Sequence, residues 1–232
     1  MDVTACLWSS ELDDFDALYT WASIWQGTTP LPSMYSTLLY LLAVGPISLL
    51  MTTAVAPDSG AHISLLKRIH YLNSHLSIPM LSLHLLHLAH EDQASPNTYI
   101  NIARLFAVTK TVMLVPANLS LPPLITSDAV GIQKSRLRLV TPSGQIRPTF
   151  STLPSLSSLI LPLNHPVWCT DRFFVDNTRA SDWRECLWQY WLDSFGEFNN
   201  IEATITVRHK QEYDPEVNPG VSFQYDNPYV SC

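Results

Sequence analysis

Short apolar runs alternate with helical repeats along the first half of the chain. Val3–Trp8, Pro46–Thr52 and Met80–Leu88 are short and strongly apolar, as expected of buried strands. Between them, apolar residues recur every three to four positions from Phe15 to Ile24 and from Ser64 to Leu76, which predicts helices that bury one face. Strands that alternate with helices are typical of an α/β fold with a mostly parallel sheet.

The stretch from Asn97 to Pro123 predicts a helix that runs into a central strand. Ser95 is a suitable cap for the helix, and Pro96 suits its first turn, where a missing N–H costs nothing. Thr111–Val115 is a short β-rich run that stops at a proline, so residues 116–120 lie at its carboxyl end. In open α/β sheets, ligands bind outside the carboxyl ends of the strands. We therefore expect a ligand site at residues 116–120.

A basic hairpin is predicted after this unit. Residues 136–141 and 146–152 are short β-rich runs around the turn Pro142-Ser143-Gly144, and we expect them to form a hairpin at the surface. The segment carries the cations Lys134, Arg136 and Arg138. An alternative interpretation is a loop whose cations meet an anionic donor or acceptor. Leu159–Pro162 is a further predicted strand.

A tryptophan-rich helix and a last strand complete the predicted fold. Asp182 with Glu185 three residues later predicts the start of the helix, and Gly196 predicts its end. Its apolar stripe consists of Leu187, Trp188, Trp191 and Phe195. We interpret this stripe as core, with stacking on a sugar ring as the alternative. Ile201–Val207 alternates apolar and polar residues, which predicts a strand with one wet face.

Composition and charge narrow the class of protein. Charged residues make up 14% and apolar residues 47% of the 232-residue chain, which fits a globular protein with one substantial core. We expect a single domain over residues 1–210 and a loosely ordered tail over residues 211–232. The net charge of −7 and the lack of a basic stripe argue against nucleic-acid binding. No basic segment precedes an apolar run at Met1, so we expect no signal peptide.

The cysteines and histidines do not predict a metal centre. The four cysteines, none of which has C-x-x-C spacing, are Cys6, Cys169, Cys186 and Cys232. We expect buried free thiols, and the redox compartment stays open. His84, His87 and His90 lie on or just after one predicted strand, where His87 points away from the other two. Because no fourth ligand is nearby, we expect no metal ligands here.

Two segments resemble a known glycosyltransferase family. The first has the order N-x-A-R at Asn101–Arg104, an apolar run, a polar triplet and a proline; the second has C-x-x-R-F from Cys169 and then the tryptophan-rich helix. This pattern resembles glycosyltransferase family 49, the dystroglycan-type glucuronyltransferases, in its fungal-type members. The resemblance implies a GT-A-like fold, which is a mixed, mostly parallel sheet flanked by helices. It also implies a UDP-sugar donor, a glycan acceptor and a Golgi or secretory location.

The resemblance also suggests site residues. In the family, an Asp-x-Asp motif at this strand end holds a divalent metal and the diphosphate of the UDP-sugar. The matching residues here are Pro116-Ala117-Asn118, which lack carboxylates, so metal-dependent catalysis with Mn²⁺ or Mg²⁺ is doubtful. The predicted donor-binding residues are Asn101, Arg104 and Asn118. The candidates for the base that takes the acceptor proton are Asp171, Asp176 and Asp182.

Residues 17–57 contain no charged residue, and two interpretations account for this. The span 35–56 is about long enough to cross a bilayer, although Gly45 and Pro46 interrupt it. Alternatively, residues 28–45 are an insertion, such as translated noncoding sequence, because joining Gly27 to Pro46 gives WQGPISLL, which resembles the first helix end and second strand of the family. We favour the insertion, since an apolar loop of this length is unusual in a compact domain.

Three functions follow from the sequence as hypotheses. The first is a glycosyltransferase that transfers a sugar from a UDP-sugar to a glycan acceptor. The second is a catalytically impaired relative that binds a glycan or a partner protein, and the missing carboxylates favour it. The third is a membrane-anchored protein, which requires the span 35–56 to be a true transmembrane segment.

Overall fold

The computed structural model describes most of the predicted strands and helices. The described residues are 3–10, 15–26, 45–75, 80–89, 95–116, 137–142, 156–170, 178–194 and 199–203. In chain order the elements are β1 (Val3–Ser10), α1 (Phe15–Trp25), β2 (Ile47–Thr53), α2 (Gly60–His75), β3 (Leu81–His87), α3 (Pro96–Leu105), β4 (Thr111–Leu114), β5 (Arg138–Pro142), β6 (Ser158–Pro162), α5 (Arg179–Ser194) and β7 (Asn199–Ala203).

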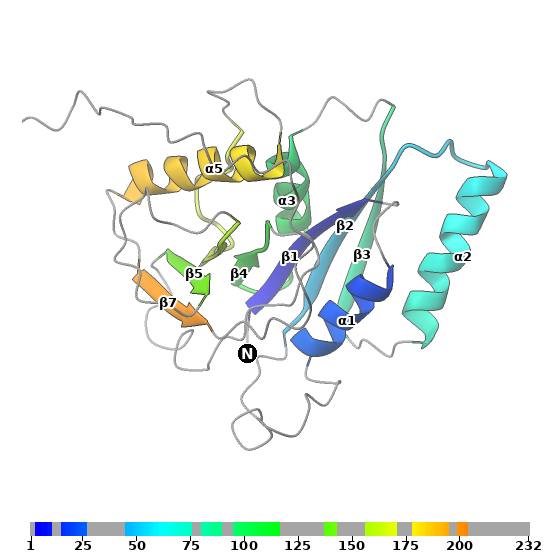
Figure 1. The fold of residues 1–232 in the computed structure, drawn as a ribbon, viewed down its shortest axis with the longest axis horizontal. Coiled ribbons are helices and arrows are strands. Elements are labelled where there is room, and N and C mark those ends of the chain that lie inside the picture. The colour runs from blue at the N-terminus through cyan, green and yellow to red at the C-terminus, as the bar shows by residue number, and fades with distance from the viewer. Residues whose placement is uncertain are drawn as a thin grey trace, which may run out of the picture.

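The strands form one mixed, mostly parallel sheet with the order β3-β2-β1-β4-β6-β5-β7 (Figure 1). Strands β3, β2, β1 and β4 are mutually parallel. Strand β6 runs antiparallel to both of its neighbours, β4 and β5, and β7 is parallel to β5. The predicted α/β class, with a mostly parallel sheet flanked by helices, is confirmed.

The direction of strand addition reverses at β1. The chain adds β2 and β3 on one side of β1, and α3 then carries it back across β1 and β2 to place β4 on the other side. Val3 pairs with Thr111 and Cys6 with Leu114 in the resulting parallel ladder. The carboxyl ends of β1 and β4 therefore meet at the topological switch point of the sheet, where open α/β proteins bind their ligands.

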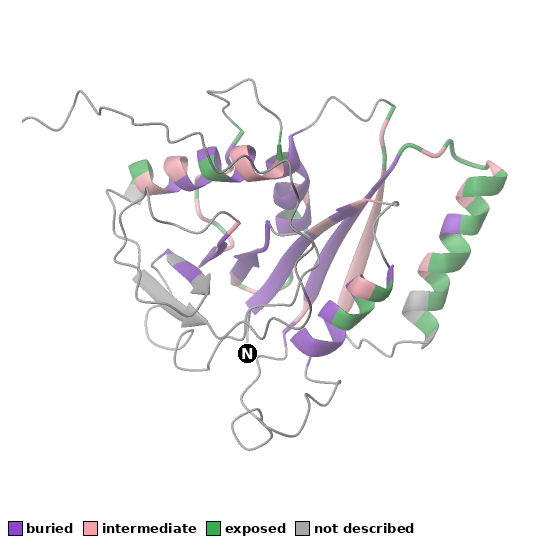
Figure 2. Ribbon diagram, viewed as in Figure 1, coloured by how far each residue is buried: buried purple, intermediate pink, exposed green. Residues whose placement is uncertain are grey.

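Helices cover both faces of the sheet (Figure 1). On one face, Phe15, Leu18 and Trp21 of α1 and Leu65 of α2 pack against the strands. On the other face, the core is built from α3 and α5, with Tyr99, Ile100, Ala103, Trp183, Leu187 and Tyr190. The central strands are buried on both sides, whereas α2 is largely exposed (Figure 2). This burial explains why the parallel strands are continuously apolar in sequence.

Two predictions about the second half of the chain are wrong. The segment predicted as one arm of a surface hairpin is β5, a strand inside the sheet, in which Leu139 is buried. It was mistaken for a surface element because its partners, β6 and β7, come later in the chain; residues 146–152 lie outside the described part. Helix α5 begins at Arg179 and not at Asp182. Its buried face consists of Trp183, Cys186, Leu187 and Tyr190.

The tryptophans of α5 that were predicted to lie in the core are only half-buried. Leu187 is buried as predicted, but Trp188 and Trp191 are half-buried and contact each other edge to face, with ring centroids 5.5 Å apart. Phe195 lies outside the described residues. Because several apolar faces were available in this helix, periodicity alone selected the wrong one.

Cys169 and Cys186 form a disulfide, which corrects the prediction that the cysteines are free thiols. The Cα atoms lie 4.9 Å apart, within the usual range for a disulfide, and the bond joins the segment after β6 to α5. Cys6 is a buried free thiol, as predicted. Cys232 lies outside the described residues.

The end of α1 contacts Gly45, the last residue of the proposed insertion. Trp25, at the end of α1, donates a hydrogen bond from Nε1 to Gly45 O at 3.1 Å, directly before β2. A side chain at position 45 would collide with Val3 O, so this position requires glycine. In the join that defines the insertion, Gly27 takes this place. Among the described residues, no helix is long and apolar enough to cross a membrane.

We expect a variant that lacks residues 28–45 to fold. The deletion places Gly27 directly before Pro46, where glycine avoids the collision with Val3 O. Its thermal midpoint should lie within about 2–4 °C of that of the full chain, which corresponds to about 1 kcal/mol at most for a domain of this size. The matched control is the same deletion with Gly27→Ala, which should be clearly less stable. Equal midpoints for the two deletion variants, or failure of both to fold, would contradict the interpretation.

The disulfide predicts a specific labelling pattern. When the unfolded, unreduced protein is alkylated, Cys6 should be labelled, whereas Cys169 and Cys186 should be labelled only after reduction. Reduction should lower the free energy of unfolding by about 2–4 kcal/mol, because the bond restricts the unfolded chain. Peptide mass mapping and urea denaturation measure these two effects. A Cys186→Ala variant, in contrast, should not respond to reductant, and labelling of Cys169 without reduction would refute the bond.

Candidate functional site

The candidate site lies at the carboxyl ends of β1 and β4. Val115 N donates to Cys6 O at 3.1 Å, so the parallel pairing continues past β4 and brings Pro116 level with Trp8, near the end of β1. Trp8 faces the α3 side of the sheet, and its Nε1 donates to Thr52 Oγ1 of β2 at 3.1 Å. The Trp8 and Tyr99 rings lie with centroids 4.8 Å apart. An aromatic pair, with one ring from β1 and one from α3, therefore lies at this rim.

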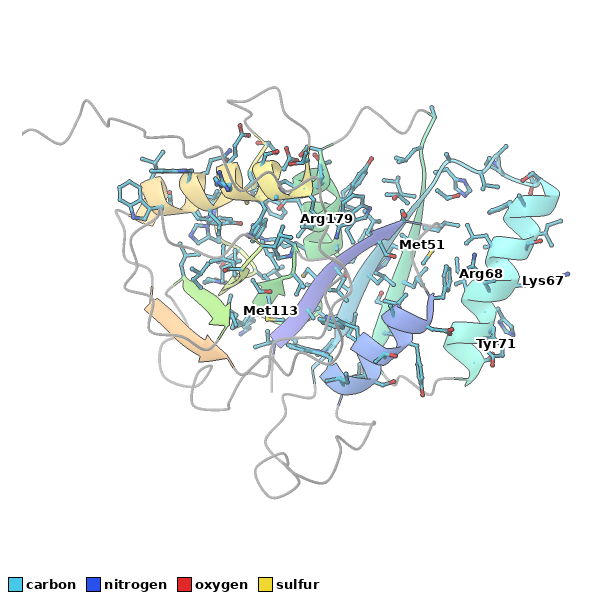
Figure 3. All side chains as sticks on the ribbon, viewed as in Figure 1. Met51, Lys67, Arg68, Tyr71, Met113 and Arg179 are labelled. Carbon is cyan, nitrogen blue, oxygen red and sulfur yellow. A yellow bond between two sulfur atoms is a disulfide. The ribbon has the colours of Figure 1, made fainter. Side chains whose placement is uncertain are left out.

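Arg179, the first residue of α5, adds a positive charge to this rim (Figure 3). Its guanidinium carbon lies 4.0 Å from the centroid of the Trp8 ring, a cation–π contact. Its Nη1 donates to Pro116 O at 3.3 Å. One half-buried cation thus contacts the strand ends on both sides of the switch point. Sequence reasoning missed Arg179 because the helix was predicted to begin three residues later.

The first turns of α3 and α5 are joined beside Arg179. Asn97 Nδ2 donates to Asp182 O at 2.6 Å, and Asn97 N lies 3.5 Å from Asp182 Oδ2. Ser95 occupies the N-cap position as predicted, but its side chain makes no capping hydrogen bond. The Asp182 carboxylate, from the neighbouring helix, approaches the orphan N–H groups of this helix start instead.

Two buried polar atoms near this junction lack partners among the described residues. They are Tyr99 Oη and Asn97 Oδ1, in residues that are 3% and 5% exposed. Burial raises the pKa of Tyr99, so its hydroxyl keeps its proton and can donate. Buried polar atoms without partners are rare in folded proteins, and an unobserved water or ligand is a common reason for them. Both residues belong to the first turns of α3, on the carboxyl side of the sheet.

Arg104, which the sequence resemblance predicts to bind the UDP-sugar, makes structural hydrogen bonds. It is fully buried, and its guanidinium donates to the carbonyl oxygens of Leu163, His165 and Val167 at 2.5–3.1 Å. Leu163 N donates to Lys110 O at the amino end of β4, which places this contact on the rim opposite the switch point. Burial lowers the pKa of Arg104 from its usual value, although the guanidinium stays charged.

The other predicted site residues are only partly placed. Asn101, one turn before Arg104, donates from Nδ2 to Trp168 O, so it holds the same segment. Binding of the UDP-sugar by Asn101 and Arg104 stays a prediction. In the structure, their side chains donate hydrogen bonds to main-chain carbonyl oxygens of residues 163–168. Asp182 is 1% exposed, which separates its carboxylate from solvent and from an acceptor. Asn118, Asp171 and Asp176 lie outside the described residues.

A divalent metal does not fit the described part of this rim. Pro116 has no side-chain oxygen or nitrogen to bind a metal, and its carbonyl oxygen already accepts a hydrogen bond from the Arg179 cation. Like charges within about 4–6 Å disfavour each other, so the guanidinium opposes a metal ion at this position. Across the described residues, His, Cys, Asp and Glu side chains form no group of three or more that could hold a metal.

Comparison with protein-family models and with curated proteins found no match to this chain.

Replacing Arg104 is expected to destabilise the protein. Arg104→Met removes the donors to three main-chain carbonyls and to Tyr190 Oη, so we expect the free energy of unfolding to fall by about 3 kcal/mol or more. Arg104→Lys should recover part of this loss, because it keeps the charge but has fewer donors. Urea denaturation gives the values. Arg184→Met, at an exposed position of α5, is the matched control; equal effects of Arg104→Met and Arg184→Met would rule out the buried contact.

Proposed function

We propose that this chain is a glycosyltransferase-like protein that binds a UDP-sugar at the carboxyl ends of β1 and β4 and transfers the sugar to a glycan acceptor. The observation that carries the proposal is the aromatic and cationic cluster of Trp8, Tyr99 and Arg179 at the topological switch point. The half-buried Trp8 ring, which packs on the buried Tyr99, suits a base or a sugar ring, and the Arg179 cation suits a diphosphate.

The sheet supports this proposal. Its order, with β6 as the reversed strand among otherwise parallel described strands, agrees with the GT-A arrangement that the sequence resemblance implies. The strand that carries the Asp-x-Asp motif in the family corresponds to β4, and β4 lies next to β1 as such a site requires. A similar fold alone would not assign a function, so the chemistry of the rim has to carry the proposal.

The transfer itself needs groups on the acceptor side. The acceptor hydroxyl attacks the anomeric carbon, the bond from that carbon to the UDP oxygen breaks, and a base takes the hydroxyl proton. Burial of Asp182 in the α3–α5 junction favours Asp171 or Asp176 for the base. Both precede α5 in sequence, in the segment that leads to Arg179.

A second candidate function is a binding module without catalytic activity. It is favoured by Pro116, which lacks the carboxylate of the family motif, and by the structural use of Asp182. In this case the rim would bind the nucleotide sugar or a glycan without transfer.

The disulfide supports a secretory location for either function. Disulfides such as Cys169–Cys186 persist in oxidising compartments and are rare in the cytosol. This agrees with the Golgi or secretory location that the resemblance implies, and glycan acceptors are found there.

The proposal is tested with a panel of UDP-sugars and oligosaccharide acceptors. We expect UDP to bind with a dissociation constant of about 1 mM or tighter, and UDP release from one UDP-sugar to rise when an acceptor is added. Calorimetry measures the binding, and a coupled assay for UDP measures the release. Binding without transfer would favour the binding module, whereas a folded protein that binds neither UDP nor any UDP-sugar would refute the proposal.

A further inference from the structure

We infer that Arg179 takes the place of the divalent metal, so that this site binds a nucleoside diphosphate without a metal ion. The inference rests on the proposed function, since it concerns the same site. Beyond that function, Arg179 is the group that neutralises the diphosphate, and UDP binding needs no metal ion.

Without a metal ion, the positive charge that balances a bound diphosphate has to come from the protein. The chain has a net charge of −7, and a diphosphate adds further negative charge when it binds. At the strand end where the family supplies metal ligands, this chain has Pro116, whose carbonyl oxygen lies 3.3 Å from Arg179 Nη1. The guanidinium therefore lies beside the strand end at which the family supplies its metal ligands. It supplies positive charge there and, by the same charge, repels a cation.

The chemistry of Arg179 suits a diphosphate. A guanidinium has five N–H donors in one plane and binds phosphate oxygens in pairs, which a point charge such as lysine does not do. A bound diphosphate can share or replace the contact to Pro116 O. The Trp8 ring, whose centroid lies 4.0 Å from the guanidinium carbon, holds the guanidinium at this rim through a cation–π contact.

The surroundings of Arg179 add to the preference for an anion. Arg179 begins a helix of 16 residues, and Asn97 joins the start of this helix to the start of α3. The starts of both helices carry partial positive charge. The Tyr99 ring contacts the same Trp8 ring as the guanidinium, and its buried hydroxyl has no hydrogen-bond partner among the described residues.

The test compares UDP with uridine, with and without metal. For the full chain, we expect the dissociation constant of UDP in EDTA to lie within about twofold of its value in Mn²⁺. Arg179→Gln should weaken UDP binding at least about tenfold, equivalent to about 1.4 kcal/mol, and leave uridine binding unchanged. The ratio of UDP to uridine affinity isolates the contact with the diphosphate, because a merely structural role would weaken both ligands together.

Two further variants complete the design. Arg184→Gln removes the same charge from an exposed position of α5 and should leave the affinity ratio unchanged. Arg179→Lys keeps the charge and should bind UDP with intermediate affinity; it carries the test if Arg179→Gln does not fold.

Each contrary outcome has a distinct meaning. If UDP binds in Mn²⁺ but not in EDTA, the inference is overturned and the proposed function stands. If Arg179→Gln weakens UDP and uridine equally, or leaves UDP unaffected, Arg179 does not bind the diphosphate. If the folded protein binds UDP under neither condition, the inference and the proposed function fall together.

Discussion

The parallel pairing of β1 with β4 is the constraint on which the rest of the structure depends. Helix α3 has to carry the chain back across β1 and β2 before β4 can pair, and this return makes two distant strand ends neighbours. Burial of the apolar strands on both faces stabilises the arrangement. Trp8 and Pro116 are brought to one rim in this way, and α5 then places Arg179 against both.

The position of α5 depends in turn on contacts made far from its own strand neighbours. Asn97 holds its first turn against α3, and Cys169–Cys186 joins its middle to the segment after β6. Arg104 fixes that segment through its main-chain carbonyls. The buried hydrogen bonds of Arg104 on the opposite rim therefore help to hold α5, and with it Arg179, in place. Arg104 has a structural role, whereas Arg179 lies at the switch point.

Local patterns predicted most of the elements, but not their long-range partners. Apolar runs and helical spacing located β1 to β4 and the helices between them, because these patterns report burial directly. The place of β5 inside the sheet depends on strands that follow it, and the disulfide depends on folded geometry that spacing does not reveal. Arg104 looks the same in sequence whether it binds carbonyls or a ligand, and Arg179 lay outside the predicted helix. The sequence predicted that β4 ends at Pro116, but it did not predict that Arg179 contacts this strand end.

We propose that the carboxyl ends of β1 and β4 form the nucleotide site. A crystal structure of the protein with UDP, prepared in EDTA, tests this claim most directly. We expect the diphosphate at this rim, with phosphate oxygens within hydrogen-bond distance of the Arg179 guanidinium and no metal ion between them. UDP bound elsewhere, for example on the opposite rim beside the segment that Arg104 holds, would contradict it.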